Sequence, residues 1–159
     1  MIGRRLLGIA AALFVIIVSL YGGYQLAEAL HLKPYGYQTS ELERGLTERG
    51  YTGSHYRRWR DPDLDEIRQT SEWTKSGSAT IHQENGRAAK FVGPHDVCWS
   101  DDQPPLDDLI RAGNAAIAKS QEPPFIQWTD DPATSTSTFD IPLGGGLKMH
   151  FICDHHEAK

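Results

Sequence analysis

Positive charge is scarce in this 159-residue chain, in which 16 lysines and arginines face 21 aspartates and glutamates. Arg4, Arg5 and Glu28 belong to the N-terminal apolar region, and without them the net charge falls from −5 to −6. Nucleic acids and anionic lipid surfaces attract proteins of the opposite charge. The charge balance therefore argues against a nucleic-acid partner.

Several motifs of catalysis and anchoring are also absent. The sequence has no Gly-x-Ser-x-Gly nucleophile elbow, and Gly144-Gly145-Gly146 is not followed by the Lys-Ser/Thr of a phosphate-binding loop. No cysteine follows the N-terminal apolar run closely, so a lipoprotein cleavage site is missing. Nothing in the sequence specifies catalysis, and we expect no cofactor.

The chain has only two cysteines, Cys98 and Cys153. An isolated pair in an oxidising compartment usually forms one disulfide. A bridge between them closes a loop of 55 residues, which stabilises the fold by roughly 4 kcal/mol if the bridge acts through chain entropy. We therefore predict a Cys98–Cys153 disulfide.

What the sequence does contain is a long apolar run close to its N-terminus. Residues 6–27 carry no charge, and as a helix they extend roughly 33 Å, close to the ~30 Å hydrocarbon core of a bilayer. Arg4 and Arg5 before the run favour a cytoplasmic N-terminus, and Tyr21 and Tyr24 suit the outer headgroup region. This pattern predicts a single-pass protein of the inner membrane whose C-terminal domain is periplasmic or extracellular.

A cleaved signal peptide is the alternative interpretation of this N-terminal region. Arg4 and Arg5 would form its basic region and Leu6–Leu20 its apolar core, and Ala27-Glu28-Ala29 matches a small-x-small cleavage pattern. The core is at the long limit for such a peptide, and it ends far from that cleavage pattern. We therefore favour a retained anchor over residues 1–29, with residues 6–27 in the lipid bilayer.

After the anchor, residues 30–39 read as a tether, residues 40–153 as an exported domain and residues 154–159 as a polar tail. Capping and periodicity predict three helices. The first covers Glu41–Arg49 behind a Ser40 cap, the second runs from Asp61-Pro62 to about Ser71, and the third follows Pro104-Pro105 and ends near Ser120.

Alternating residues and turn signals predict the strands, with Asn85-Gly86 as the strongest hairpin turn. The predicted strands are Tyr51–Trp59, Ser78–Glu84, Arg87–Val92, Phe125–Trp128, Thr136–Leu143 and Leu147–Cys153. The stretch Gly93–Pro104 is expected to be irregular, and 130–135 a loop. The predicted class is α+β, with two short helices and one longer helix packed on an antiparallel sheet of four to six strands.

The segment Tyr56-Arg57-Arg58-Trp59-Arg60 is the best candidate binding surface. Arginine and aromatic residues are enriched at the energetic centres of interfaces, since a guanidinium pairs with carboxylates and stacks on rings. The alternative is local neutralisation by the acidic residues that follow, Asp61, Asp63, Asp65 and Glu66. The sequence leaves both interpretations open.

A second candidate surface is the acidic loop that contains Trp99, Asp101 and Asp102. Its aromatic residue beside two carboxylates suits contact with a basic partner or a divalent cation. Together with the arginine segment it favours a protein partner in the membrane or the periplasm, because complementary charge speeds encounter and sets specificity.

The C-terminal histidines His150, His155 and His156 are weak candidates for a metal site. Alternation in Leu147–Cys153 places Cys153 toward the core and His150 on the opposite face. Residues beyond Cys153 are expected to fray. A zinc site needs three or four rigidly held ligands, and this spacing matches no common ligand pattern.

The function predicted from these features is binding, by an accessory or assembly subunit of a membrane complex or by an immunity-type inhibitor of a toxin. The alternative is a membrane-tethered, metal-dependent hydrolase that uses the C-terminal histidines.

Overall fold

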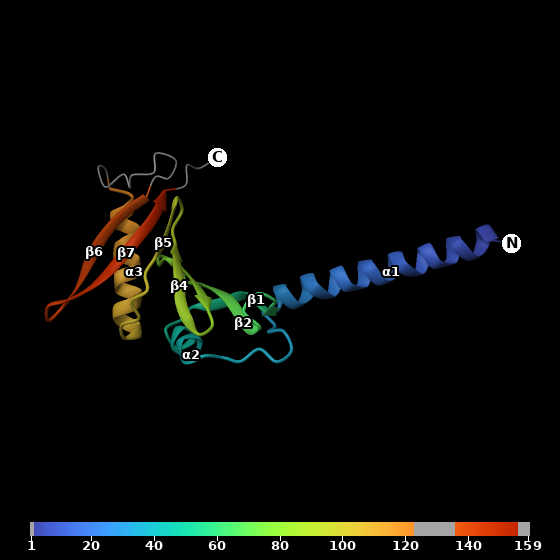
Figure 1. Cartoon of the computed structure of the whole chain (residues 1–159), viewed down its shortest axis with the longest axis horizontal. Helices are drawn as coiled ribbons and strands as arrows, with labels where there is room; N and C mark the ends of the chain where they lie inside the picture. The colour runs from blue at the N-terminus through green and yellow to red at the C-terminus, as the bar shows by residue number, and fades with distance from the viewer. Residues whose placement is uncertain (1, 123–135, 156–159) are drawn as a thin grey trace.

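A single long helix, α1 (Ile2–Ala29), forms the N-terminal part of the computed structural model, which describes residues 2–122 and 136–155. Figure 1 shows α1 projecting away from the rest of the chain. Its segment Gly8–Ala29 has a mean hydropathy of 1.9 and buries none of its most apolar window. By length and composition, this helix is suited to cross a membrane.

Seven antiparallel strands form one sheet in the order β1-β2-β3-β4-β5-β7-β6. They are β1 (Thr52–Asp61), β2 (Glu66–Thr74), β3 (Thr80–Glu84), β4 (Arg87–Val92), β5 (Asp96–Trp99), β6 (Thr136–Gly144) and β7 (Leu147–His155). With α1, α2 (Glu41–Glu48) and α3 (Leu106–Ser120), the overall class is α+β, as predicted.

Local signals in the sequence predicted several of these elements correctly. The Ser40 hydroxyl accepts a hydrogen bond from the Glu43 N–H at 3.2 Å, which caps α2. Asn85 and Gly86 have φ of 48° and 81°, as a tight turn between β3 and β4 requires. The hairpin of β6 and β7 is confirmed as well.

The helix predicted from Asp61 to Ser71 is wrong, because this segment is a hairpin turn followed by β2. The Asp61 carboxylate accepts hydrogen bonds from the backbone N–H groups of Asp63 and Leu64, and these bonds close a short turn. Asp65 then takes a positive φ of 53°, which ends any helical path. The apolar Leu64 and Ile67 stay exposed and pack against no core.

The sheet has seven strands where four to six were predicted, and β5 and β7 account for two of the differences. The stretch expected to be irregular contains β5, which pairs with β4 and β7. Strand β7 continues past Cys153 to His155, where His155 pairs with Asp96. The predicted strand 125–128, the loop 130–135 and His156 lie outside the described residues.

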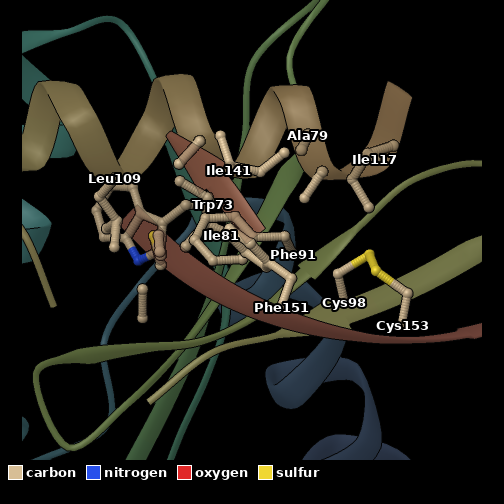
Figure 2. Close-up of a cluster of buried hydrophobic side chains, with 14 of the residues drawn as sticks. Trp73, Ala79, Ile81, Phe91, Cys98, Leu109, Ile117, Ile141, Phe151 and Cys153 are labelled. Carbon is tan, nitrogen blue, oxygen red and sulfur yellow. A yellow bond between two sulfur atoms is a disulfide. The ribbon is translucent and has the colours of Figure 1, made fainter. Parts of the chain in front are cut away.

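Helix α3 covers one face of the sheet and forms the core with it. Figure 2 shows Leu109 and Ile117 of the helix above Phe91 and Phe151 of the strands. The rings of Phe91 and Phe151 meet edge to face at 5.7 Å between centroids. Gly113 lies directly against the Phe91 ring, with no room for a side chain.

The Cys98–Cys153 disulfide is confirmed and joins two directly paired residues of β5 and β7. Both cysteines are fully buried, on the face that α3 covers. Because the bond links two adjacent strands through cysteines 55 residues apart in sequence, it fixes β7 beside β5.

A buried carboxylate fastens the segment before α2 to the sheet. Glu43 is fully buried and accepts hydrogen bonds from the Tyr37 hydroxyl at 2.6 Å, Ser71 at 3.1 Å and Lys33 at 3.1 Å. Burial is the largest cause that raises the pKa of Tyr37, and the hydrogen bond to Glu43 adds to it. Lys33 and Tyr37, which belong to the predicted tether, are therefore fastened to α2.

Candidate functional site

The predicted arginine segment lies on β1, which is an edge strand of the sheet. Strand alternation divides it between two faces. Arg57 pairs with Thr70 and Trp59 with Arg68, which places both on the face opposite α3. Tyr56 points the other way, where its ring meets Trp73 at 6.2 Å.

Ion pairing separates the arginines of this segment. Arg60 pairs with Asp65 at 2.6 Å, as local neutralisation predicts. Arg57 and Arg58 are exposed and make no hydrogen bond or ion pair with any residue that the structure describes. Asp65 therefore neutralises one of the three arginines, and the other two have no charged partner within residues 2–122 and 136–155.

Trp99 lies on the same face of the sheet as Arg57 and Trp59. Its neighbour Cys98 points into the core, so Trp99 points out on the other side. Arg68, Glu84 and Arg87 lie between the two tryptophans, and with Trp99 and Asp101 they line a cavity of about 310 Å³. The structure thus brings Arg57, Trp59, Trp99 and Asp101 to one continuous surface, which we call the outer face.

Charged pairs hold the centre of the outer face in place. The Arg68 guanidinium donates to Glu84 Oε1 at 2.6 Å and lies 2.9 Å from Asp61 Oδ2. Arg87 donates to the backbone carbonyl of Asp101 at 3.2 Å. These contacts fix the strands beneath the outer face, whereas Arg57 at its edge remains unpaired among the described residues.

The carboxylate of Asp102, unlike that of its neighbour Asp101, forms a hydrogen bond within the domain. Its Oδ2 accepts the backbone N–H of His150 on β7 at 2.8 Å, so it anchors the loop after β5 to the sheet. Of the two predicted acidic contacts, Asp101 alone keeps its carboxylate without a hydrogen bond among the described residues.

A second cavity on the outer face, of about 370 Å³, lies nearer α1. His55, Arg57, Glu72, His82 and Lys90 are among its lining residues. Glu72 lies between the two histidines, 3.7 Å from His55 and 3.4 Å from His82. Burial lowers the pKa of His82, and the nearby Lys90 adds to this effect, while Glu72 opposes it.

Of the three C-terminal histidines, His150 and His155 are described by the structure, and they do not lie together. His150 is exposed, with its Nδ1 3.0 Å from Asp140 Oδ1. His155 lies on the opposite side of β7, within the core face. Residues 2–122 and 136–155 contain no group of three or more His, Cys, Asp or Glu side chains placed to hold a metal ion.

The prediction missed the surroundings of His155. Its Nδ1 lies 2.6 Å from Asp96 Oδ1 and its Nε2 3.0 Å from Ser137 Oγ, while Ser120 donates to the other Asp96 oxygen at 2.8 Å. This is the Asp–His–Ser order of a nucleophilic triad. Ser137, however, is fully buried, so its hydroxyl is closed to a substrate, and the network acts as polar packing at the end of the core.

No protein-family model, curated protein or solved structure matches this chain.

Proposed function

We propose that the chain is a single-pass membrane-anchored protein whose exported domain binds a protein partner through the outer face. It acts as an accessory or assembly subunit of a membrane complex, or as an immunity-type inhibitor of a toxin. The apolar helix α1 and a buried disulfide support this location, since disulfides persist outside the reducing cytosol.

The unpaired Arg57 beside the exposed Trp59 on an edge strand is the observation that carries the proposal. An exposed guanidinium without a partner in the described chain can form a bidentate pair with a carboxylate of another protein. Trp59 is 40% exposed and offers a large apolar surface next to it. The open edge of β1 supplies backbone groups for a further strand.

Site-specific photo-crosslinking in native membranes tests this surface. A crosslinking amino acid at position 57 or 59 of the full chain should capture one defined protein. The matched control is position 60 on the same strand, which is held by Asp65 and faces away from Trp59. Capture at all three positions alike, or at none, would contradict a specific interface on the outer face.

The anchor and its location are tested separately from the interface. Intact mass measurement on chain purified from membranes should retain residues 6–27, whereas a mass that begins near residue 30 would show a cleaved signal. Peptide mapping without reduction should recover Cys98 linked to Cys153. Free thiols at both positions would contradict export to an oxidising compartment.

A further inference from the structure

The C-terminal end of α1 packs against β1. Glu28 on the last turn of the helix lies 3.0 Å from the His55 ring nitrogen Nε2. Tyr24, Leu32, Pro34 and Tyr56 line a cavity of about 300 Å³ in the same junction. Figure 1 shows β1 beside the end of α1. The position of α1 therefore fixes where β1 stands relative to any membrane that the helix crosses.

A wider cleft of about 700 Å³ opens at this junction, around the edge of β1. Its lining residues include Tyr24, Pro34, Tyr56, Arg57, Arg58 and Trp59, and no acidic residue. Arg57 and Arg58 have no ion pair within the described part of the chain, so the cleft carries two uncompensated positive charges. Its lining thus combines two cationic side chains with three aromatic ones.

The cleft lies at the height of the outer headgroups when α1 spans the bilayer. Arg5 and Tyr24 are 19 residues apart, which is roughly 28 Å along a helix. That distance matches the hydrocarbon core, so Tyr24 reaches the outer boundary when Arg5 stands at the inner one. Because Tyr24 also lines the cleft, Arg57 and Arg58 face the layer in which lipid phosphates are found.

We propose that this cleft binds the headgroup phosphate of an anionic glycerophospholipid, with Arg58 as its principal ligand. The inference rests on the proposed membrane anchor. Arg58 is best placed because its guanidinium lies against Gly36, where a Cβ would come within 3.3 Å of Cζ. A guanidinium at this position can form bidentate hydrogen bonds to phosphate, and Tyr24 can pack beside the glycerol region.

The acidic charge of the whole domain does not oppose binding at this point. Charges farther than about 8 Å are largely screened at physiological ionic strength. Two acidic groups at the far end of β1 are already engaged, since Asp61 pairs with Arg68 and Asp65 with Arg60, and no acidic residue lines the cleft itself. A phosphate in the cleft therefore meets the two free arginines first.

Native mass spectrometry of the full chain tests the site. The chain is reconstituted in nanodiscs that contain equal amounts of phosphatidylglycerol and phosphatidylcholine. It is then released from the nanodiscs in the mass spectrometer, and the lipid that stays bound to it is identified by mass. The wild-type chain should retain phosphatidylglycerol in preference, and Arg58→Ala should lower that preference about fivefold, the factor for one arginine at a membrane surface. Arg60→Ala, whose guanidinium is already paired with Asp65, should leave it unchanged.

Each other outcome overturns a defined part of the proposal. Equal retention of the two lipids, or no effect of Arg58→Ala, refutes the lipid site while leaving the anchor intact. Displacement of the lipid by excess inorganic phosphate shows a phosphate site without lipid preference. A chain that does not co-elute with nanodiscs refutes the anchor and the site together. Capture of a protein at position 58 in native membranes, with no lipid retained, assigns the cleft to the protein partner.

Discussion

Replacement of the buried Glu43 on α2 by alanine should destabilise the domain strongly. The carboxylate is fully buried and accepts three hydrogen bonds, from Tyr37, Ser71 and Lys33. A hydrogen bond to a charged group contributes about 1.5–3 kcal/mol, and a buried hydroxyl left without its acceptor costs about 1–3 kcal/mol. The sum overstates the effect, because several of these groups keep other partners.

The surviving contacts set the net magnitude. The Gln83 amide still donates to the Tyr37 and Ser71 hydroxyl oxygens, and the Lys33 side chain is 29% exposed, so its amine can turn to water. We therefore expect Glu43→Ala to lower the free energy of unfolding by about 3 kcal/mol. Glu43→Gln keeps the shape and part of the hydrogen bonding, so it should cost less.

Guanidinium unfolding of the full chain in detergent, followed by tryptophan fluorescence, measures this effect. The signal reports on the network directly, since the Trp73 indole donates to Ser71 at 2.8 Å. Glu41→Ala is the matched control on the same helix, because that side chain is 96% exposed, and it should change stability by less than about 0.5 kcal/mol. A loss below about 1 kcal/mol for Glu43→Ala would refute the role given to the buried carboxylate.

Three further predictions concern the core and the outer face. Reduction of the disulfide, or the double change Cys98→Ala/Cys153→Ala, should destabilise by up to about 4 kcal/mol in thermal unfolding, and an unchanged midpoint would contradict a structural bond. Gly113→Ala should lose about 1 kcal/mol, since crowding of Phe91 outweighs the gain in helix propensity, whereas a more stable variant would show that the ring can move. The pKa of His82 in the folded chain should lie below its usual value of 6.5. Between these two pKa values the unfolded chain binds more protons than the folded chain. The free energy of unfolding should therefore fall as the pH drops from 6.5 toward the folded pKa. An NMR titration of His82 checks this, and His82→Asn should flatten the slope.

Local signals predicted the elements whose ends they mark. Ser40 with Glu43, and Asn85 with Gly86, fix backbone geometry through their own side chains or conformational preferences, so they could be read without the fold. The helix predicted to start at Asp61 was wrong for a related reason. Its carboxylate accepts backbone N–H groups in a short turn as readily as at a helix start, and only the pairing of β2 with β1 and β3 decides which follows.

The parts that were missed depend on long-range pairing. Strand β5 carries Asp96 at a buried position, where a charged residue is not expected from the sequence. Its hydrogen-bond partners His155 and Ser120 come from 59 and 24 residues away. The backbone pairing of His155 with Asp96 makes His155 part of β7. The division of the arginine segment between two faces follows from alternation alone, whereas the pairing of Arg60 and the freedom of Arg57 required the fold.

The position of β7 has a consequence for how this domain is completed. The last described strand is inserted between β5 and β6, so the sheet stays split into two unfinished parts until that strand arrives. A chain that emerges N-terminus first can form the β1–β4 hairpins early, because their partners are close in sequence. The edge of β5 and one half of the disulfide stay exposed for longer. Closure of the sheet therefore waits for β7, the strand that also carries Cys153 and so completes the disulfide.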